Sequence, residues 1–323
     1  VYKRQLQWER KLLDLSLRNM LINLRFTKAV VPLLCSSVSM LEDSLSDGEE
    51  FKVLSRPDNM TVSGEGGIPI EAITNLGPFK EFIELEGKHK RLHSFYTEKE
   101  LNLSLTKIYR SAKSSMEENG ASTLYLALGL LRWTESSKSS VVRYAPIILL
   151  PVDISRKIAN KGYAMRMRDE DAQINITLLE FLKQNYDVKI AGLNPLPTDN
   201  HGLDLPKIFA IMRHGIMSMP MWDVVEVGLI GNFSFSQFVM WNDIHNNCDM
   251  LEKNDIVRSL IKGAVDWNCE IPSEVENDEA YLPITADESQ LRAINMAANN
   301  VSFVLHGPVS YTHLRAHETL ANL

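Results

Sequence analysis

Cysteine is scarce in this 323-residue chain, and long apolar runs are missing. The cysteines are widely spaced and form no C-x-x-C pair, which argues against a disulfide framework and a cysteine-ligated zinc site and indicates a reducing compartment; they are Cys35, Cys248 and Cys269. No apolar run approaches the roughly 18 residues of a membrane-spanning helix, and the chain does not begin with the charged and apolar regions of a signal peptide. We therefore expect a cytoplasmic protein with no membrane partner.

Positive charge is in deficit, because 34 Lys and Arg face 41 Asp and Glu and give a net charge of −7. Such a balance disfavours a dedicated nucleic-acid-binding protein. The charges are unevenly distributed, however. Residues 270–288 contain seven acids and no base, whereas residues 132–168 contain eight bases and only two acids.

The basic stretch 132–168 is a candidate surface for nucleic acid. Aromatic residues interrupt it, and basic and aromatic side chains together follow phosphates and stack bases; these are Trp133, Tyr144 and Tyr163. The alternation of YAMRMR predicts that Arg166 and Arg168 point outward together from a half-exposed strand. The candidate contacts are Arg166, Arg168, Lys161 and Arg143. The simpler interpretation of the same residues is a solvated sheet face with no ligand.

Periodicity and turn residues predict an α+β fold, with a mainly antiparallel sheet and packed helices. The expected helices are at 5–26, where leucines recur at helical spacing, at 101–120 with Gly120 as its end, and at 174–186, 204–217, 235–247 and 254–263. The expected strands are 123–133, 144–154, 163–168 and 222–230. A Gly- and Ser-rich loop or insertion is expected at about 44–80.

The stretch LPITADESQLRAINMAANNVSFVLHGP, residues 282–308, is typical of a helix, a tight turn and a buried strand. Asp287 and Gln290 have capping-box spacing, and the buried stripe of the helix is predicted as Leu291, Ile294 and Ala298. The strand VSFVL leads into Gly307–Pro308, as in the approach to a phosphate loop of the form G-x-x-x-x-G-K-[ST]. The positions for the second glycine, lysine and hydroxyl are instead Thr312, His313 and Leu314. We therefore expect no ATP hydrolysis from this chain.

Residues 282–308 resemble the opening of the motor domain of bacterial superfamily 1 DNA/RNA helicases. This resemblance implies a RecA-like α/β fold for residues 285–308, a Q-motif role for Gln290 in reading adenine, and phosphate-loop roles for Gly307 and Pro308. It also implies ATP and Mg²⁺ as cofactors and DNA or RNA as partner of a full-length parent, with no cofactor for this chain.

The residues before this motif resemble the domain-of-unknown-function family 4011, an N-terminal accessory domain of many such helicases. The strings that carry this resemblance are WERKLLDLSLRNMLINLR, LYLALGLLRWTE, YAPIILLPVDISRK, INITLLEFL and FSFSQFVMWNDIHNN. The expected organisation is an accessory domain at 1–269, an acidic linker at 270–284 and the motor start at 285–308. The last residues, 309–323, are similar to a translated sequencing-adapter string, so we expect a foreign tail on a fragment that is open at both ends.

Several alternatives remain open. Gln290 has a simpler role as a helix cap. His313 and His317 have helical spacing for zinc, but the adjacent Glu318 does not complete the H-E-x-x-H order. A second polar cluster is explained by an exposed helix face; it consists of Asp243, His245, Cys248 and Asp249.

The element order is also similar to that of nuclease cores. Asp153 would be the metal-binding aspartate, but YAMRMR contains no Glu or Lys to complete the site. The rival to the helicase interpretation is a scaffold that binds a partner protein and does not contact nucleic acid.

Overall fold

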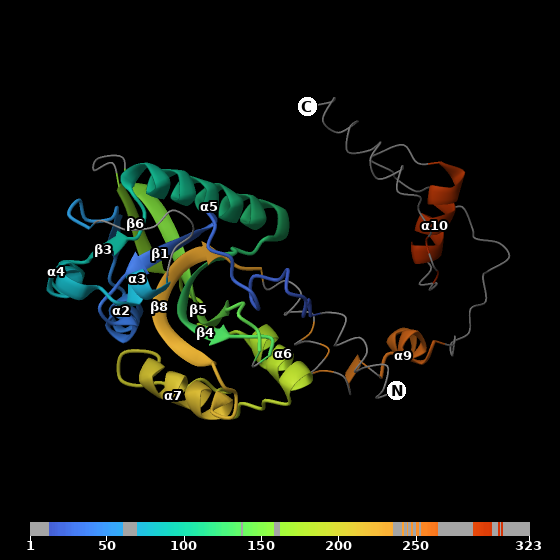
Figure 1. Ribbon diagram of the computed structural model, residues 1–323. Helices are drawn as coiled ribbons and strands as arrows, with labels where there is room; N and C mark the ends of the chain where they lie inside the picture. The colour runs from blue at the N-terminus through green and yellow to red at the C-terminus, as the bar shows by residue number, and fades with distance from the viewer. Residues whose placement is uncertain are drawn as a thin grey trace. The chain divides into compact units, whose positions relative to one another are not determined.

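The computed structural model describes most of the first 234 residues and two later segments. The described ranges are 13–60, 70–136, 138–157, 162–234, 253–263 and 287–298, with the single residues 241, 244, 247, 250, 251, 303 and 305. The chain forms two compact units, one at Leu6–Asn246 and the other comprising Val1–Gln5 and Asn247–Leu323. The larger unit contains the sheet, and the smaller contains two described helices (Figure 1).

An eight-stranded sheet forms the larger unit. In spatial order its strands are β4 (Leu124–Trp133), β8 (Asp223–Asn232), β1 (Val30–Leu34), β3 (Arg91–Ser94), β2 (Phe51–Leu54), β6 (Gly162–Met167), β5 (Arg143–Lys157) and β7 (Gln173–Ile174). Of the described pairings, only that of β2 with β3 is parallel. The prediction of an α+β fold with a mainly antiparallel sheet is confirmed.

The sheet closes on itself because β5 is long enough to pair with two strands. Its first part, from Arg143 to Pro151, pairs with β4, and the part from Val152 to Lys157 pairs with β6. Since β4 also pairs with β8, hydrogen bonding continues around a ring of seven strands, which explains the strong curl of the sheet in Figure 1. A closed ring leaves few unpaired strand edges.

The helices are short except for α5. They are α2 (Val38–Ser46), α3 (Ile70–Thr74), the 3₁₀ helix η1 (Gly77–Phe79), α4 (Lys80–Lys88), α5 (Glu98–Asn119), α6 (Ile176–Tyr186), α7 (Leu205–Ile216), α9 (Asp255–Lys262) and α10 (Glu288–Ala298). In Figure 1 the sheet lies between α5 and α7. Among the described residues, no helix combines the length and hydrophobicity needed to cross a bilayer.

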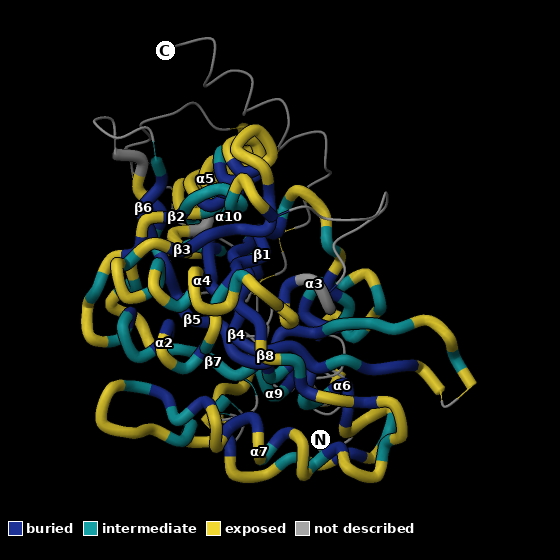
Figure 2. Tube along the Cα trace, turned by 60° about the vertical axis from the view of Figure 1, so that its left-hand side comes forward, coloured by how far each residue is buried: buried dark blue, intermediate teal, exposed yellow. Residues whose placement is uncertain are grey.

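Two apolar layers cover the two faces of the sheet. The larger layer receives side chains from α2, α5, α6 and α7, and the smaller from α3 and α4. Successive residues of β4 contribute to different layers, with Leu126 in the first and Ala127 in the second. The strands are accordingly buried along most of their length (Figure 2). The strand expected at 123–133 is confirmed.

The predicted N-terminal helix is wrong for residues 13–26, which form turns and bends. Polar side chains there bind the nearby backbone and compete with helical hydrogen bonds. Asn19 donates to the carbonyl of Asp14 at 2.6 Å, and its Oδ1 accepts from the N–H of Leu21 at 2.9 Å. Leu13, Leu21 and Leu24 are nevertheless buried, because irregular backbone also places apolar side chains in the core.

The prediction of a loop at 44–80 is wrong where the chain forms helices and a strand. β2 lies within the sheet between β3 and β6, and α3 packs its Ile70 and Ile73 into the second apolar layer. Four residues between polar turns give too little periodicity to reveal a strand. The same limitation hid β1, β3 and β7, and α4 was also missed.

Most longer elements agree with expectation. α5 ends at Gly120, whose φ of 68° is left-handed, and it begins with a capping box formed by Thr97 and Glu100. The helices α6, α7 and α9 and the strands β5, β6 and β8 also lie where periodicity predicts them. α10 is confirmed as a helix, but its predicted stripe is wrong, because Ile294 is 41% exposed and Met296 is the buried residue.

Other expectations fall outside the described residues. These are the strand 301–305 apart from residues 303 and 305, the linker 270–284, the tail 309–323 and most of the helix expected after Ser234.

Gly129 fixes the position of α7 on the sheet. It lies at an irregularity in the β4–β8 pairing and has a φ of 73°. A Cβ added there would lie 2.7 Å from Cζ of Phe209, a fully buried residue of α7. Both the backbone conformation and the close approach therefore require glycine.

Replacing Gly129 with Ala should lower the free energy of unfolding by more than about 3 kcal/mol, because strain and overpacking add. Gly120→Ala is the matched control, since Gly120 is also left-handed but its Cβ would meet no atom within 4 Å. We expect it to cost about 1 kcal/mol. Urea denaturation measures both, and equal losses would contradict the proposed role of the Phe209 contact.

Candidate functional site

Gln290 begins α10 in the geometry expected of a capping box. Its Oε1 accepts from the N–H of Asp287 at 3.2 Å, and Asp287 Oδ1 accepts from the N–H of Gln290 at 2.9 Å. The helix start therefore holds the amide of Gln290 in one place. The helix-capping interpretation of Gln290 is confirmed, and its adenine-reading role stays a prediction.

Several predicted site residues lie outside the described part of the chain. They are Gly307, Pro308, Lys161, His313, His317, Glu318, Asp243, His245, Cys248 and Asp249.

The predicted basic surface is divided between the two ends of β5. Arg143 is the first residue of this strand, and Arg166 lies opposite Asp153, ten residues further along. At about 3.3 Å per residue, that separation is about 33 Å along the strand. The two arginines thus do not form one compact patch.

Arg143 is held at the loop end of the β4–β5 hairpin, where it pairs with Trp133. Its guanidinium lies 6.0 Å from the ring centre of Trp133 and pairs with Glu135 at 2.5 Å. Its side chain is 19% exposed. These contacts make Arg143 mainly a structural residue at this end of the sheet.

Arg166 and Arg168 do not point outward together, and this prediction is wrong for Arg168. The side chain of Arg166 is 67% exposed and lies 3.6 Å from Asp153, whereas that of Arg168 is only 8% exposed. Arg168 follows the end of β6, so strand alternation does not determine its direction. Its guanidinium lies 5.4 Å from the ring centre of Tyr125 and pairs with Glu170 at 3.0 Å.

The aromatic residues of the basic stretch are mostly enclosed. Trp133 has no exposed surface, and Tyr163 is 7% exposed, with its hydroxyl 3.0 Å from Thr106 Oγ1. Base stacking needs an open ring face, which these two residues lack. Immediately after Arg168, the exposed acids 169–171 further reduce the local positive potential.

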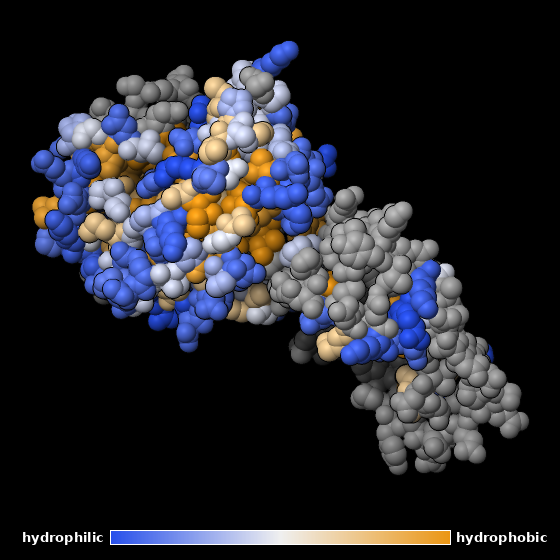
Figure 3. Space-filling model, turned by 90° about the horizontal axis from the view of Figure 1, so that it is seen from below, coloured by the Kyte–Doolittle hydropathy of each residue, from blue (hydrophilic) through white to orange (hydrophobic). Residues whose placement is uncertain are grey.

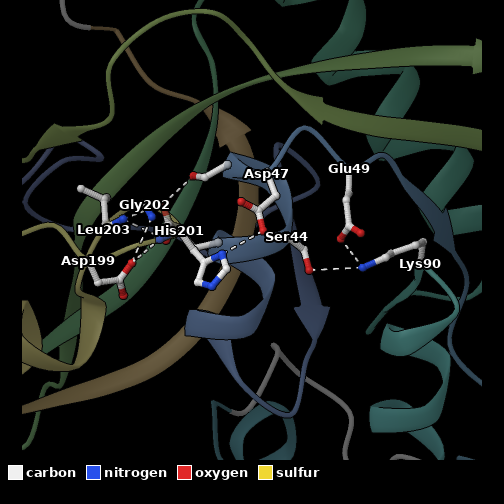
Figure 4. A network of polar contacts seen from close by, with 10 residues as sticks. Ser44, Asp47, Glu49, Lys90, Asp199, His201, Gly202 and Leu203 are labelled. Carbon is white, nitrogen blue, oxygen red and sulfur yellow. Dashed lines mark hydrogen bonds and ion pairs between the residues drawn. The ribbon is translucent and has the colours of Figure 1, made fainter.

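Sequence reasoning missed a polar network that joins α2 to the loop before α7 (Figure 4). At its centre Glu42, with no exposed surface, accepts from the N–H of Leu203 at 3.2 Å and from Ser46 Oγ at 2.8 Å. His201 Nδ1 lies 3.1 Å from Asp47 Oδ2. A Cβ on Gly202 would lie 2.7 Å from Glu42 Oε1, so glycine allows the close approach. We call these contacts the Glu42 latch.

Burial dominates the electrostatics of the latch. It raises the pKa of Glu42, although hydrogen bonds from Ser46 and Leu203 oppose the shift. Burial also raises the pKa of Asp43, with a further contribution from Asp199. In contrast, backbone hydrogen bonds from His201 and Gly202 lower the pKa of Asp199. Only the contact between distant segments reveals this network, because Glu42 alone is typical of a surface helix.

A metal centre has no support within the described ranges. No group of three or more His, Cys, Asp or Glu side chains there is arranged to hold an ion. Asp153, the aspartate of the nuclease alternative, pairs with Arg166 instead.

A family model described as "Protein of unknown function (DUF4011)" matches residues 11–182. The chain belongs to this family. The matched range ends within α6, whereas β8, which pairs with both β4 and β1, lies beyond it. The sheet of this DUF4011 protein is therefore completed by residues outside the match. No curated protein and no solved structure matches the chain.

Methionines are exposed where α7 of this DUF4011 protein ends. Met217 is 78% exposed and Met221 is 56% exposed. Figure 3 shows the larger unit from below, the side on which α7 lies in Figure 1, with apolar side chains at the surface among hydrophilic ones. Flexible methionine side chains adapt to differently shaped partners.

Arg168 and Arg166 should respond differently to truncation. Arg168→Ala removes a nearly buried guanidinium and its contacts with Tyr125 and Glu170, so we expect a loss of about 1–2 kcal/mol in unfolding free energy. Arg166→Ala is the control and should change stability by less than about 0.5 kcal/mol, as for other exposed pairs. Thermal and urea unfolding test this, and equal effects would show that Arg168 is not structural.

The Glu42 latch predicts a pH dependence of stability. A carboxyl group with a raised pKa binds its proton more tightly in the folded protein, so its contribution to stability is present below its ordinary pKa and is lost as pH rises through the raised value. Glu42→Gln removes this titration while keeping an acceptor for Leu203. The unfolding free energy of the variant minus that of the wild type should therefore increase from about pH 4 to about pH 8.

Glu42→Ala is the control for the hydrogen bonds themselves. It leaves the buried N–H of Leu203 without this acceptor and should cost about 1–3 kcal/mol relative to Glu42→Gln throughout that pH range, because neither variant titrates at this position. A constant difference between Glu42→Gln and the wild type would contradict the raised pKa.

Proposed function

We propose that the chain is part of an ATP-dependent DNA/RNA helicase, comprising its accessory domain and the first helix of its motor. The observation that carries this proposal is the Asp287–Gln290 capping box, which fixes an amide at the start of α10. The same residues carry the resemblance to superfamily 1 helicases. The match to DUF4011 is compatible with an accessory domain before such a motor.

The amide of Gln290 has the chemistry needed to read adenine. Its oxygen accepts one hydrogen bond and its nitrogen donates two, so it complements the N6 amine and the N7 acceptor of the base. Oε1 now accepts from Asp287 at 3.2 Å. We expect nucleotide in the parent protein to take over this acceptor.

Triphosphate chemistry requires more than the adenine contact. Lysine neutralises the β- and γ-phosphates, and a hydroxyl binds Mg²⁺ in a phosphate loop. His313 and Leu314 stand at these positions in the present sequence. ATP and Mg²⁺ are accordingly proposed as cofactors of the parent helicase, with no hydrolysis by this chain.

Among the described candidate contacts, Arg166 is the most available for nucleic acid, because its side chain is 67% exposed, whereas those of Arg143 and Arg168 are 19% and 8% exposed. We expect the full chain to bind fluorescently labelled single strands weakly and with strong salt dependence. Arg166→Ala should reduce the slope of log affinity against log salt by about 0.7 if the arginine contacts one phosphate. Fluorescence anisotropy over a salt series measures this slope.

Arg213→Ala provides a matched control, because Arg213 is also partly exposed and paired with acids but lies on α7. It should leave the slope unchanged. If the chain binds neither DNA nor RNA at low salt, the nucleic-acid role of this domain is wrong. If it binds but Arg166→Ala has no effect, the proposed location is wrong.

The second candidate function is a scaffold for a partner protein. The wide separation of Arg143 and Arg166 and the exposure of Met217 and Met221 favour it. Such a module would retain its partner in high salt, since apolar contacts are not screened by ions.

A further inference from the structure

A pocket of about 220 Å³ lies between α2, α4 and the strands β1, β2 and β3. Its floor is apolar, and its lining includes Leu34, Leu41, Phe51, Ile83 and Leu92. Its polar side includes Ser44, Lys88 and Lys90. The pocket thus combines an apolar interior with positive charge at one side.

The volume limits the size of an occupant. A cavity of about 150 Å³ holds one benzene molecule, and pockets for drug-sized ligands start at about 300 Å³. A pocket of about 220 Å³ therefore accommodates one ring, or a branched chain of similar size, with a short substituent.

Lys90 supplies a directed positive charge. Its Nζ lies 3.3 Å from Ser44 Oγ and pairs with Glu49 (Figure 4). It also lies 5.4 Å from the ring centre of Phe51. An ammonium group has three hydrogens, and the described hydrogen bonds use two. One donor is left for an anionic ligand without breaking the pair with Glu49.

The backbone of Lys90 gives independent support. Its φ is 58°, in the left-handed region, where glycine or asparagine is the ordinary choice. The turn holds it there, because its N–H donates to the carbonyl of Gly87 at 2.9 Å and its carbonyl accepts from Lys52 at 2.9 Å. This is the position directly after the cap of α4, where helices commonly end with a left-handed residue, usually glycine. Glycine would adopt this backbone conformation at lower cost, so the presence of lysine indicates that its side chain has a role.

The remaining charged and reactive groups are compatible with an anion. Lys88 is 61% exposed and lies 3.4 Å from Glu84, so this acid is already paired. Cys35 also lines the pocket, and burial raises the pKa of its thiol to about 11. The thiol is therefore neutral at physiological pH and does not repel a carboxylate.

We propose that this pocket binds a small apolar carboxylate. The ring or branched chain lies on Phe51, Ile83 and Leu92. The carboxylate accepts a hydrogen bond from Lys90 Nζ. Such a ligand is a free acid or an apolar residue at the C-terminus of a polypeptide.

The test uses 3-phenylpropionate and its uncharged analogue 3-phenylpropanamide, added to the full chain. Methyl NMR signals of Ile83 and Leu92 report occupancy, and calorimetry gives the affinities. We expect the acid to bind at least about tenfold more tightly than the amide, because the ammonium group makes a charge-assisted hydrogen bond only with the acid.

Two variants separate binding from folding. Lys90→Gly should fold at least as stably as the wild type, since glycine suits the left-handed backbone, yet it should lose about tenfold in affinity for the acid and little for the amide. Gly87→Leu adds a side chain to the pocket lining, where a Cβ meets no atom within 4 Å. It should abolish binding of both compounds while leaving α4 intact.

Lys88→Ala is the matched control and should change affinity for the acid by less than about twofold, because this exposed lysine is paired with Glu84. Equal affinities for acid and amide, or unchanged binding by Lys90→Gly, would overturn the proposal. The proposal would also be overturned if millimolar 3-phenylpropionate caused no chemical-shift change in the methyl signals of Ile83 and Leu92.

An acetylated tripeptide ending in phenylalanine distinguishes the two sources of the ligand. Binding at least as tight as that of 3-phenylpropionate supports a polypeptide C-terminus, and weaker binding supports a free acid. With either result, the pocket binds an apolar carboxylate.

Discussion

The fold depends on the pairing of β4 with both β5 and β8. These two sets of hydrogen bonds connect a hairpin that is local in sequence to β8, which begins about ninety residues after the end of β4. They also close the sheet, and successive side chains of β4 enter two apolar layers because they point to opposite faces. Gly129 of β4 closely approaches Phe209 of α7, and Ala127 lies in the layer on the other face.

Closure of the sheet also determines where charge is found. Because β5 pairs first with β4 and then with β6, Arg143 and Arg166 lie near different partner strands. Each arginine also has a local acid, Glu135 or Asp153. Basic residues that are close in sequence thus become separate, partly neutralised positions. This arrangement weakens the case for an extended nucleic-acid surface and strengthens the case for interactions at discrete sites.

The Glu42 latch and the pocket use opposite sides of α2. Glu42 accepts from Ser46 and from Leu203 in the loop before α7, whereas Leu41 and Ser44 line the pocket. The helix begins at Ser37, whose side chain accepts from the N–H of Met40. A nine-residue helix thereby connects the placement of α7 to a small binding cavity. Proteins commonly position ligand-binding side chains on such rigid elements.

The sequence by itself determined the long elements and their class. Sustained apolar periodicity predicted β4, β5, α6 and α7, and the glycine at position 120 predicted where α5 ends. Local chemistry was also sufficient for the Asp287–Gln290 capping box, because both residues lie within one helical turn. The proposed roles of Gly307 and Pro308 depend on the resemblance to helicases and stay predictions.

Only the tertiary structure decided features that depend on distant segments. Short strands such as β2 become strands through pairing with partners that their four residues do not specify. Polar side chains overrode leucine periodicity at residues 13–26, and the end of β6 allowed Arg168 to turn onto Tyr125. Glu42 and Lys90 acquired their environments from Leu203 and Phe51, which are remote in sequence. The pattern of residues along the sequence reflects the conformation that each segment prefers by itself. Burial and charge pairing depend instead on which segments come into contact in the folded chain.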